Sequence, residues 1–208
     1  MGEVMSLEWN LERISRAGFI GILRGDDPDA LIERGLALAQ AGVRVLEVTL
    51  DSTDAARIFA TLKEQLDDEV MLGVGTVMHP PTALPSVADW GADFALSPVN
   101  PEGFIQLANE FDILAVPGAA TPGELWKAHT AGAMLVKLYP AATNWSAPHA
   151  GEQGGFGCHP PSLPPLGYEY CSSKTSQNHR RLQSEPRVDH LLAALVLDLY
   201  PRNRPFHR

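Results

Sequence analysis

Short apolar runs alternate with amphipathic segments along the first two thirds of the chain. Six such runs alternate with stretches of helical periodicity, and one run together with its helical stretch takes roughly 20 to 25 residues. The runs are continuous and do not alternate with polar residues, as expected for parallel strands buried on both faces. We therefore predict six strands, over residues 19–23, 43–50, 70–77, 94–97, 113–116 and the lysine-bearing segment 133–141.

The segments before and between the runs carry helix start signals. Pro28 follows Asp26 and Asp27, either of which can cap a helix, and Thr121 with Glu124 forms a capping-box pattern. Helices are predicted over residues 7–17, 28–40, 53–66, 81–90, 102–110 and 121–130. This alternation is typical of a (β/α)8 barrel or of an open doubly wound sheet.

Polar residues lie inside or just beyond the predicted strands, and in a barrel such strand ends meet at one face. Lys137 stands in an apolar run that ends at Pro140. Burial lowers the pKa of a lysine, and a neutral amine can attack a carbonyl to form a Schiff base. The candidate residues at these strand ends are Arg24, Glu47, Thr76, Ser97 and Lys137.

Each candidate also has a purely structural interpretation. Lys137 can extend its amine to solvent from an edge strand, and Glu47 can be a buried acid paired with Arg44 or Arg24. Thr76, which follows two glycines, can simply end a strand, and Arg24 can belong to a surface ion pair. The residues alone leave these alternatives open.

Composition narrows the class of protein. The chain has 208 residues and a formal net charge of -9, which argues against nucleic acid as the main partner. No apolar run is long enough to span a bilayer, and residues 1–16 lack the core of a signal peptide. We expect a cytoplasmic protein with no membrane partner, in which Cys158 and Cys171 are free thiols.

The chain changes character after about residue 143. Residues 1–143 carry 9 basic and 20 acidic residues, whereas residues 144–208 carry 7 basic and 5 acidic ones. We expect two parts, a (β/α) region over residues 1–143 and an irregular tail over residues 144–208 with one helix near residues 188–200. A zinc site is a weak alternative, because the spacing of its candidates matches no compact pattern: Cys158, His159, Cys171 and His179.

Six ordered motifs in the body resemble the KDPG/KHG aldolase family, class I aldolases that release pyruvate from 2-keto-3-deoxy-6-phosphogluconate, its galactonate analogue or 4-hydroxy-2-oxoglutarate. The resemblance covers about residues 7–143. It rests on Ile22-Leu23-Arg24-Gly25, Val45-Leu46-Glu47-Val48-Thr49-Leu50, Gly73-Val74-Gly75-Thr76-Val77, Ser97-Pro98, Val116-Pro117-Gly118 and Lys137-Leu138-Tyr139-Pro140-Ala141.

The resemblance implies a (β/α)8 TIM barrel, a homotrimer and a small keto acid as substrate, with no cofactor and no metal. Lys137 matches the Schiff-base lysine and Glu47 the general acid/base. Arg24 matches a residue that holds the substrate carboxylate in some members. Other members place that arginine where this chain has Asp51, which favours galactonate-type specificity. The remaining residues expected to bind substrate are Thr76, Ser97, Pro98 and Tyr139.

The chain departs from the family after the lysine motif. The glycine turns of the family's seventh and eighth strands, which bind the substrate phosphate, have no counterpart; Gly154-Gly155 follows no strand. We therefore predict an incomplete barrel of about six units, with unpaired edges on its first and sixth strands. Two functions follow: an aldolase that handles phosphorylated substrates poorly, or a catalytically impaired or non-enzymatic remnant of one.

Overall fold

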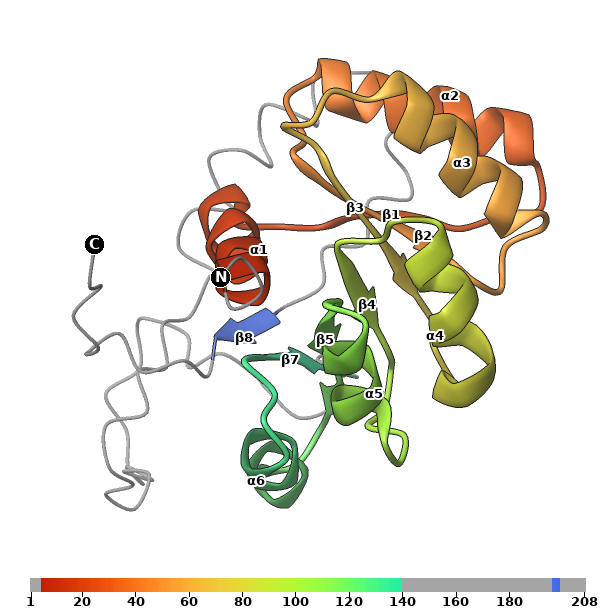
Figure 1. The fold of residues 1–208 in the computed structure, drawn as a ribbon. Helices are drawn as coiled ribbons and strands as arrows, with labels where there is room; N and C mark the ends of the chain where they lie inside the picture. Colours follow the sequence, from red (N-terminus) through yellow and green to blue (C-terminus); the bar gives the residue numbers. More distant parts are fainter. Residues whose placement is uncertain (1–4, 140–195, 199–208) are drawn as a thin grey trace, which may run out of the picture.

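Helices and strands largely alternate in the computed structural model, which describes residues 5–139 and 196–198 (Figure 1). The helices are α1 (Met5–Ala17), α2 (Pro28–Gln40), α3 (Ala55–Gln65), α4 (Pro80–Asp89), α5 (Phe104–Glu110) and α6 (Pro122–Thr130). The strands are β1 (Gly21–Leu23), β2 (Val45–Thr49), β3 (Met71–Gly75), β4 (Phe94–Leu96), β5 (Leu114–Val116), β6 (Gly118–Ala119), β7 (Leu135–Leu138) and β8 (Val196–Asp198).

The first five strands form one parallel sheet in chain order, β1-β2-β3-β4-β5. Pro117, which has no N–H to donate, separates β5 from β6, and β6 then pairs with β7 in parallel. The Pro117 carbonyl accepts a hydrogen bond from the Lys137 amide at 2.9 Å. The strand order therefore continues past the proline, and the fold is a parallel α/β structure of the TIM-barrel type, as predicted.

Two hydrophobic clusters flank the strands. The larger one lies between the sheet and helices α2 to α6, of which α2 and α3 run side by side (Figure 1). The second lies on the other face and joins Leu11 and Ile14 of α1 to strand residues that include Val45, Met71 and Phe94. Because these three are the first residues of β2, β3 and β4, α1 covers the amino ends of the strands.

Local signals explain where several elements begin. The Asp27 carboxylate accepts hydrogen bonds from the Asp29 and Ala30 amides at the start of α2, and Thr121 and Glu124 form the capping box of α6. Both predicted caps are confirmed. The two-residue strand β6 was not predicted, since Pro117 stands between it and the apolar run before it.

The predicted helix over residues 188–200 is wrong for its described part. Residues 196–198 form β8, which pairs with β7 in antiparallel orientation, with Val196 opposite Lys137. The strand that carries the lysine is therefore not an unpaired edge; within the described residues, β1 has β2 as its sole strand partner. The rest of the tail, with Gly154-Gly155, Cys158, His159, Cys171 and His179, lies outside the described residues.

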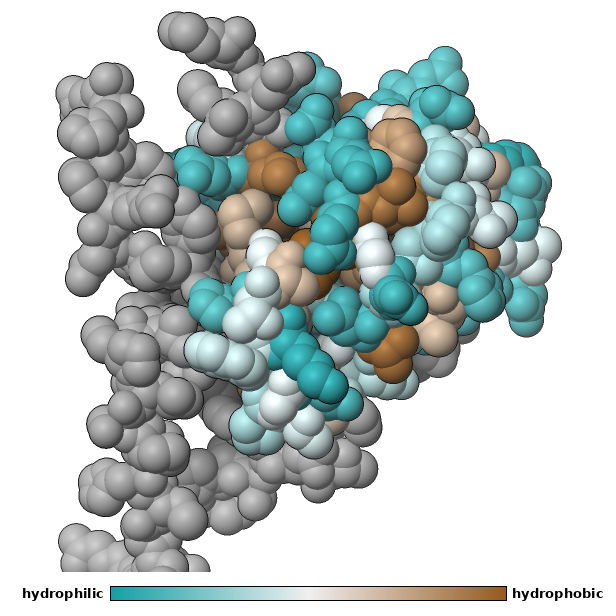
Figure 2. All heavy atoms as spheres, turned by 60° about the horizontal axis from the view of Figure 1, so that its bottom comes forward, coloured by the Kyte–Doolittle hydropathy of each residue, from teal (hydrophilic) through white to brown (hydrophobic). Residues whose placement is uncertain are grey.

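Exposed apolar side chains are scattered over several elements. Figure 2 shows one face, on which hydrophobic patches are interrupted by hydrophilic residues. The large exposed hydrophobic residues are Trp9, Met78, Val99, Phe111, Trp126 and Tyr139. Among the helices that the structure describes, none has the length and apolar content that crossing a bilayer requires.

Candidate active site

The candidate residues gather at the carboxyl ends of the strands. Arg24 follows β1 directly, Thr76 follows β3 and Ser97 follows β4, while Lys137 is the third residue of β7. Glu47 is the central residue of β2. In parallel α/β folds this end of the sheet is where ligands bind, since the loops there can vary without disturbing the core.

Glu47 is a carboxylate inside the fold, with 1% of its surface exposed. Burial raises its pKa, while the positive charges of Lys137 and then Arg24 oppose that rise and Asp51 adds to it. Its Oε2 atom is buried and has no hydrogen-bond partner among the described residues. Lys137 and Arg24 are therefore close enough to act electrostatically on a carboxylate that can hold a proton at higher pH than usual.

Arg24 is held by three side chains from neighbouring strand ends. Its Nη2 donates to Thr76 Oγ1 at 2.8 Å, its Nε donates to Thr49 Oγ1 at 3.4 Å, and its Nε lies 3.3 Å from Asp51 Oδ1. Thr49 Oγ1 also shares a 2.9 Å hydrogen bond with Ser52 Oγ. The guanidinium thus has a fixed place although half of its side-chain surface is exposed.

Asp51 and Thr76 complete this network. Partial burial alone would raise the pKa of Asp51, but a hydrogen bond from Thr49, the charge of Arg24 and a hydrogen bond from Thr76 lower it below its usual value. Thr76 has a φ of 61°, a left-handed conformation that is costly for a β-branched residue. Such strain is tolerated when surrounding contacts fix it and is common at functional sites.

Lys137 is half-buried, and its Nζ lies 5.6 Å from the centre of the Tyr139 ring. An ammonium at this distance is attracted to the ring face. The Tyr139 side chain is 50% exposed. The amine therefore lies beside an aromatic ring that reaches the surface of the described part of the molecule.

Ser97 and Pro98 lie in the loop after β4, beside the strand that pairs with β7. Ser97 is fully buried, and its Oγ accepts a hydrogen bond from the Val99 amide at 3.4 Å. A Cβ atom on Gly118 would lie 2.1 Å from the Pro98 carbonyl oxygen, so the loop approaches β6 closely. Gly118 is opposite Lys137 in the strand pairing, which brings this loop near the lysine.

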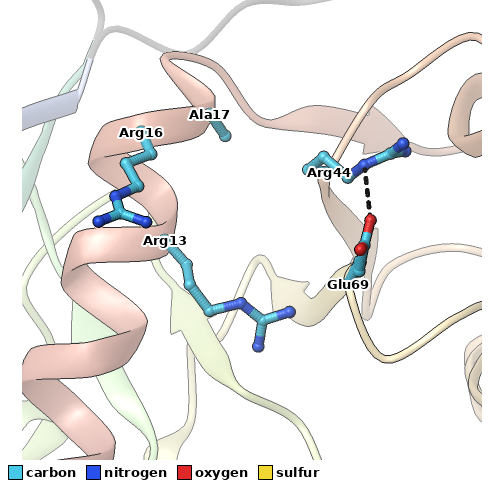
Figure 3. Close-up of a pocket in the computed structure, with 5 residues that line it drawn as sticks. All are labelled: Arg13, Arg16, Ala17, Arg44 and Glu69. Atoms are coloured by element: carbon cyan, nitrogen blue, oxygen red, sulfur yellow. Dashed lines mark ion pairs between the residues drawn. The ribbon is translucent and has the colours of Figure 1, made fainter.

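A small cavity of about 200 Å³ lies at the opposite end of the sheet, lined by Arg13, Arg16, Ala17, Arg44 and Glu69 (Figure 3). Arg44 pairs with Glu69 at 3.8 Å, Arg13 donates to the Asp68 carbonyl, and Arg16 points away from Arg44 and pairs with Glu12. Each guanidinium already has a partner, and none of the predicted site residues lines this cavity. It is separate from the candidate site.

Sequence reasoning missed some of the site. Thr49 accepts a hydrogen bond from Arg24, and Ser52 accepts one from the Gly25 amide after β1, but the sequence analysis assigned neither residue a function. Gly75, which lies against Glu47, was noted only as a member of the Gly73–Val77 motif. Their roles depend on the register between β2 and its neighbours, which no spacing within one strand reveals. In the part of the chain that the structure describes, no three His, Cys, Asp or Glu side chains are grouped as metal ligands.

The family model for "KDPG and KHG aldolase" matches residues 11–149, two thirds of the chain. The chain belongs to this family. The resemblance stated from the motifs is thereby confirmed, and the match begins within α1 and includes the lysine motif. The arrangement described above is therefore the candidate active site of a KDPG/KHG aldolase family member.

The curated relatives that match this chain carry the names of aldolases. The KHG/KDPG aldolase of Escherichia coli K12 is 37% identical over 108 residues, 52% of this chain and 50% of the relative. The 2-dehydro-3-deoxy-6-phosphogalactonate aldolase of the same organism is 28% identical over 123 residues, 59% of this chain and 60% of the relative. This chain thus spans about half the length of the curated relatives it matches.

Solved structures of family members agree with the fold. The native KDPGal structure is 31% identical with a TM-score of 0.54, over 59% of each chain. The KDPG aldolase of Legionella pneumophila, whose crystal structure holds pyruvate as a covalent carbinolamine, is also 31% identical, with a TM-score of 0.51 over 59% of each chain. Both likenesses extend over little more than half of either molecule.

Proposed function

We propose that this chain is a class I aldolase that forms an imine between Lys137 and a 2-keto acid and releases pyruvate and an aldehyde. The substrate class is a 2-keto-3-deoxy sugar acid phosphate or 4-hydroxy-2-oxoglutarate. The observation that carries the proposal is the buried Glu47 carboxylate, on which the charges of Lys137 and Arg24 both act. Family membership supports the same reaction type.

The proposed chemistry uses two groups. The Lys137 amine attacks the keto carbon to give a carbinolamine, and Glu47 moves protons through a water as hydroxide leaves to form the iminium. Glu47 then takes the proton of the substrate's C4 hydroxyl, the C3–C4 bond breaks, and its electron pair passes to the iminium to give an enamine. Protonation of the enamine at C3 and hydrolysis of the imine release pyruvate and restore the amine.

Five other residues would orient the substrate. The Arg24 guanidinium is a planar donor that suits a carboxylate, and Thr76, which already accepts from its Nη2, would lie beside the same carboxylate. The loop at Ser97 and Pro98 lies next to β6, and the ring of Tyr139 lies near Nζ. We propose that these groups line the space in which the keto acid reacts.

Borohydride reduction in the presence of pyruvate tests the imine. We expect the mass of a reduced pyruvate adduct on the peptide that contains Lys137 and none on Lys127, which is exposed on α6 and serves as an internal control. The Lys137→Arg variant should lose the adduct. Labelling that spreads equally over both lysines, or an unmodified Lys137 in a folded sample, would contradict the proposal.

Substrate choice and assembly are further parts of the proposal. Arg24 follows β1 and Asp51 takes the place at which other members carry an arginine, which supports galactonate-type specificity. Assays with the gluconate and galactonate epimers, each with and without phosphate, would measure that preference and the predicted weakness toward phosphate. Light scattering would test the predicted homotrimer.

The alternative is a protein that keeps this fold without the reaction. The observation in its favour is β8, an antiparallel neighbour of β7, where a parallel barrel continues with a parallel strand. A cooperative thermal transition combined with no adduct at Lys137 would support this alternative.

A further inference from the structure

Strand β3 carries two glycines that face the interior two residues apart. Gly73 is opposite Glu47 and Gly75 is opposite Thr49 in the pairing with β2, and all five residues of β3 are buried. Residues two apart on a strand lie on the same face of the sheet. The two glycines therefore leave two adjacent spaces on one face of β3.

Different side chains fill the two spaces. A Cβ atom on Gly73 would lie 2.5 Å from the Phe94 ring, which belongs to the hydrophobic cluster beneath α1. A Cβ atom on Gly75 would lie 1.6 Å from Glu47 Oε1 and 2.4 Å from its Cδ, and the three atoms nearest to it all belong to Glu47. The space at Gly73 is therefore filled by a ring of the hydrophobic core, whereas the space at Gly75 is filled by the Glu47 carboxylate.

Glu47 cannot share that space with another side chain. Its backbone is fixed because β2 pairs with β1 on one side and with β3 on the other, with Glu47 opposite both Ile22 and Gly73. A methyl group at position 75 would occupy the site of Oε1, so the carboxylate would have to swing away through its side-chain torsions. The position of the acid is thus decided by the next strand and not by Glu47 alone.

We propose that Gly75 is the positioning residue for Glu47, because the absence of a side chain there lets the carboxylate extend along β3 toward the strand ends that carry Arg24 and Thr76. As far as catalysis is concerned, this rests on the function proposed above. It assigns the second glycine of the Gly-Val-Gly segment a role in acid–base chemistry, distinct from the packing role of the first.

A stability cycle tests the geometry without any assay of activity. Gly75→Ala should lower the urea midpoint of unfolding in the presence of Glu47 and change it little in the Glu47→Ala background, where the colliding carboxylate is gone. Gly73→Ala is the matched control on the same strand, and its loss of stability should be the same in both backgrounds because its collision is with Phe94. If Gly75→Ala does not fold alone, recovery of folding in the double variant still supports the proposal; equal losses in both backgrounds would overturn it.

Two further measurements follow the carboxylate. In ¹³C-carboxylate NMR, assigned with Glu47→Gln, Gly75→Ala should move the Glu47 titration toward its ordinary range, while Gly73→Ala should leave it in place. The turnover number with keto acid should fall roughly 100-fold in Gly75→Ala at little changed KM. Glu47→Asp in the Gly75→Ala background should recover part of that loss, since its carboxylate is one methylene shorter.

These outcomes separate the two proposals. Wild-type protein that never traps pyruvate refutes the aldolase function, while the stability cycle and the titration still test Gly75. Wild-type protein that turns over substrate, together with a folded Gly75→Ala variant of unchanged rate and unchanged Glu47 titration, refutes the role of Gly75 and leaves the aldolase function intact.

Discussion

At the scale of single residues, the candidate site is a small set of oppositely charged side chains that differ in how far they are buried. Glu47 is enclosed, while Arg24 and Asp51 are each 49% exposed in their side chains. Glu47, Arg24 and Lys137 were predicted from the sequence because a charge inside or beside an apolar strand is unusual. Thr49 and Gly75 were not, since a hydroxyl or a glycine in a strand has no distinctive signal until its cross-strand neighbours are known.

The raised pKa of Glu47 has a consequence for stability. Between the ordinary value of 4.5 and the higher folded value, the unfolded chain has released this proton and the folded chain has kept it. The contribution of Glu47 is therefore most favourable below about pH 4.5 and is lost as pH rises through its folded pKa, by at most about 1.4 kcal/mol per pH unit within that window.

Urea unfolding of wild type and Glu47→Gln across this range measures the effect. We expect the free energy of unfolding of the wild type to fall relative to that of the variant as pH rises, because the amide never ionises. A difference between wild type and Glu47→Gln that stays constant with pH would contradict the assigned burial.

At the scale of elements, helix boundaries followed local chemistry and strand boundaries did not. The predicted bounds of α2 agree with the structure because the signals that set them are local. Asp27 and Pro28 start the helix, and the Gly42 amide donates to the Ala39 carbonyl where it ends. The strands are shorter than the apolar runs that predicted them, because pairing with neighbours sets their ends. The antiparallel β8 depends on a partner about 60 residues away, and so a helical pattern was favoured there.

The capping box of α6 should contribute to the free energy of unfolding. Thr121 Oγ1 accepts from the Glu124 amide at 3.3 Å, and hydrogen bonds from the Ala120 and Thr121 amides lower the pKa of Glu124. Thr121→Ala should cost about 1 kcal/mol of the free energy of unfolding. His79→Ala, at the N-cap of α4 where no side-chain cap bond exists, is the control and should cost clearly less in the same denaturant series.

At the scale of the whole molecule, the two hydrophobic clusters pack different helices against the strands. One packs α2 to α6 against the outer face, and the other fills the inner face and ends against α1. The sequence predicted the alternation of elements and the buried strands, because both follow from periodicity. The division of the core into two clusters depends on how strands face one another, which periodicity does not specify.

Ile14 tests the contribution of α1. Its side chain is 4% exposed and packs in the inner cluster. Ile14→Ala should lower the free energy of unfolding by about 2 to 4 kcal/mol, because it removes buried methyl groups and leaves a cavity. Trp9→Ala, on the same helix but 52% exposed, should cost much less in the same calorimetric or denaturant measurement. Similar losses for both would mean that α1 does not seal the inner core.

Coverage of the amino ends of β2, β3 and β4 by α1 leaves the carboxyl side as the route between the inner face and solvent in the described part of the fold. If Lys137 holds the three-carbon fragment covalently, the aldehyde has to leave by the carboxyl side of the strands while pyruvate is still bound to the lysine. Release is then ordered, aldehyde first and pyruvate second, and pyruvate should inhibit the forward reaction by rejoining the vacated amine.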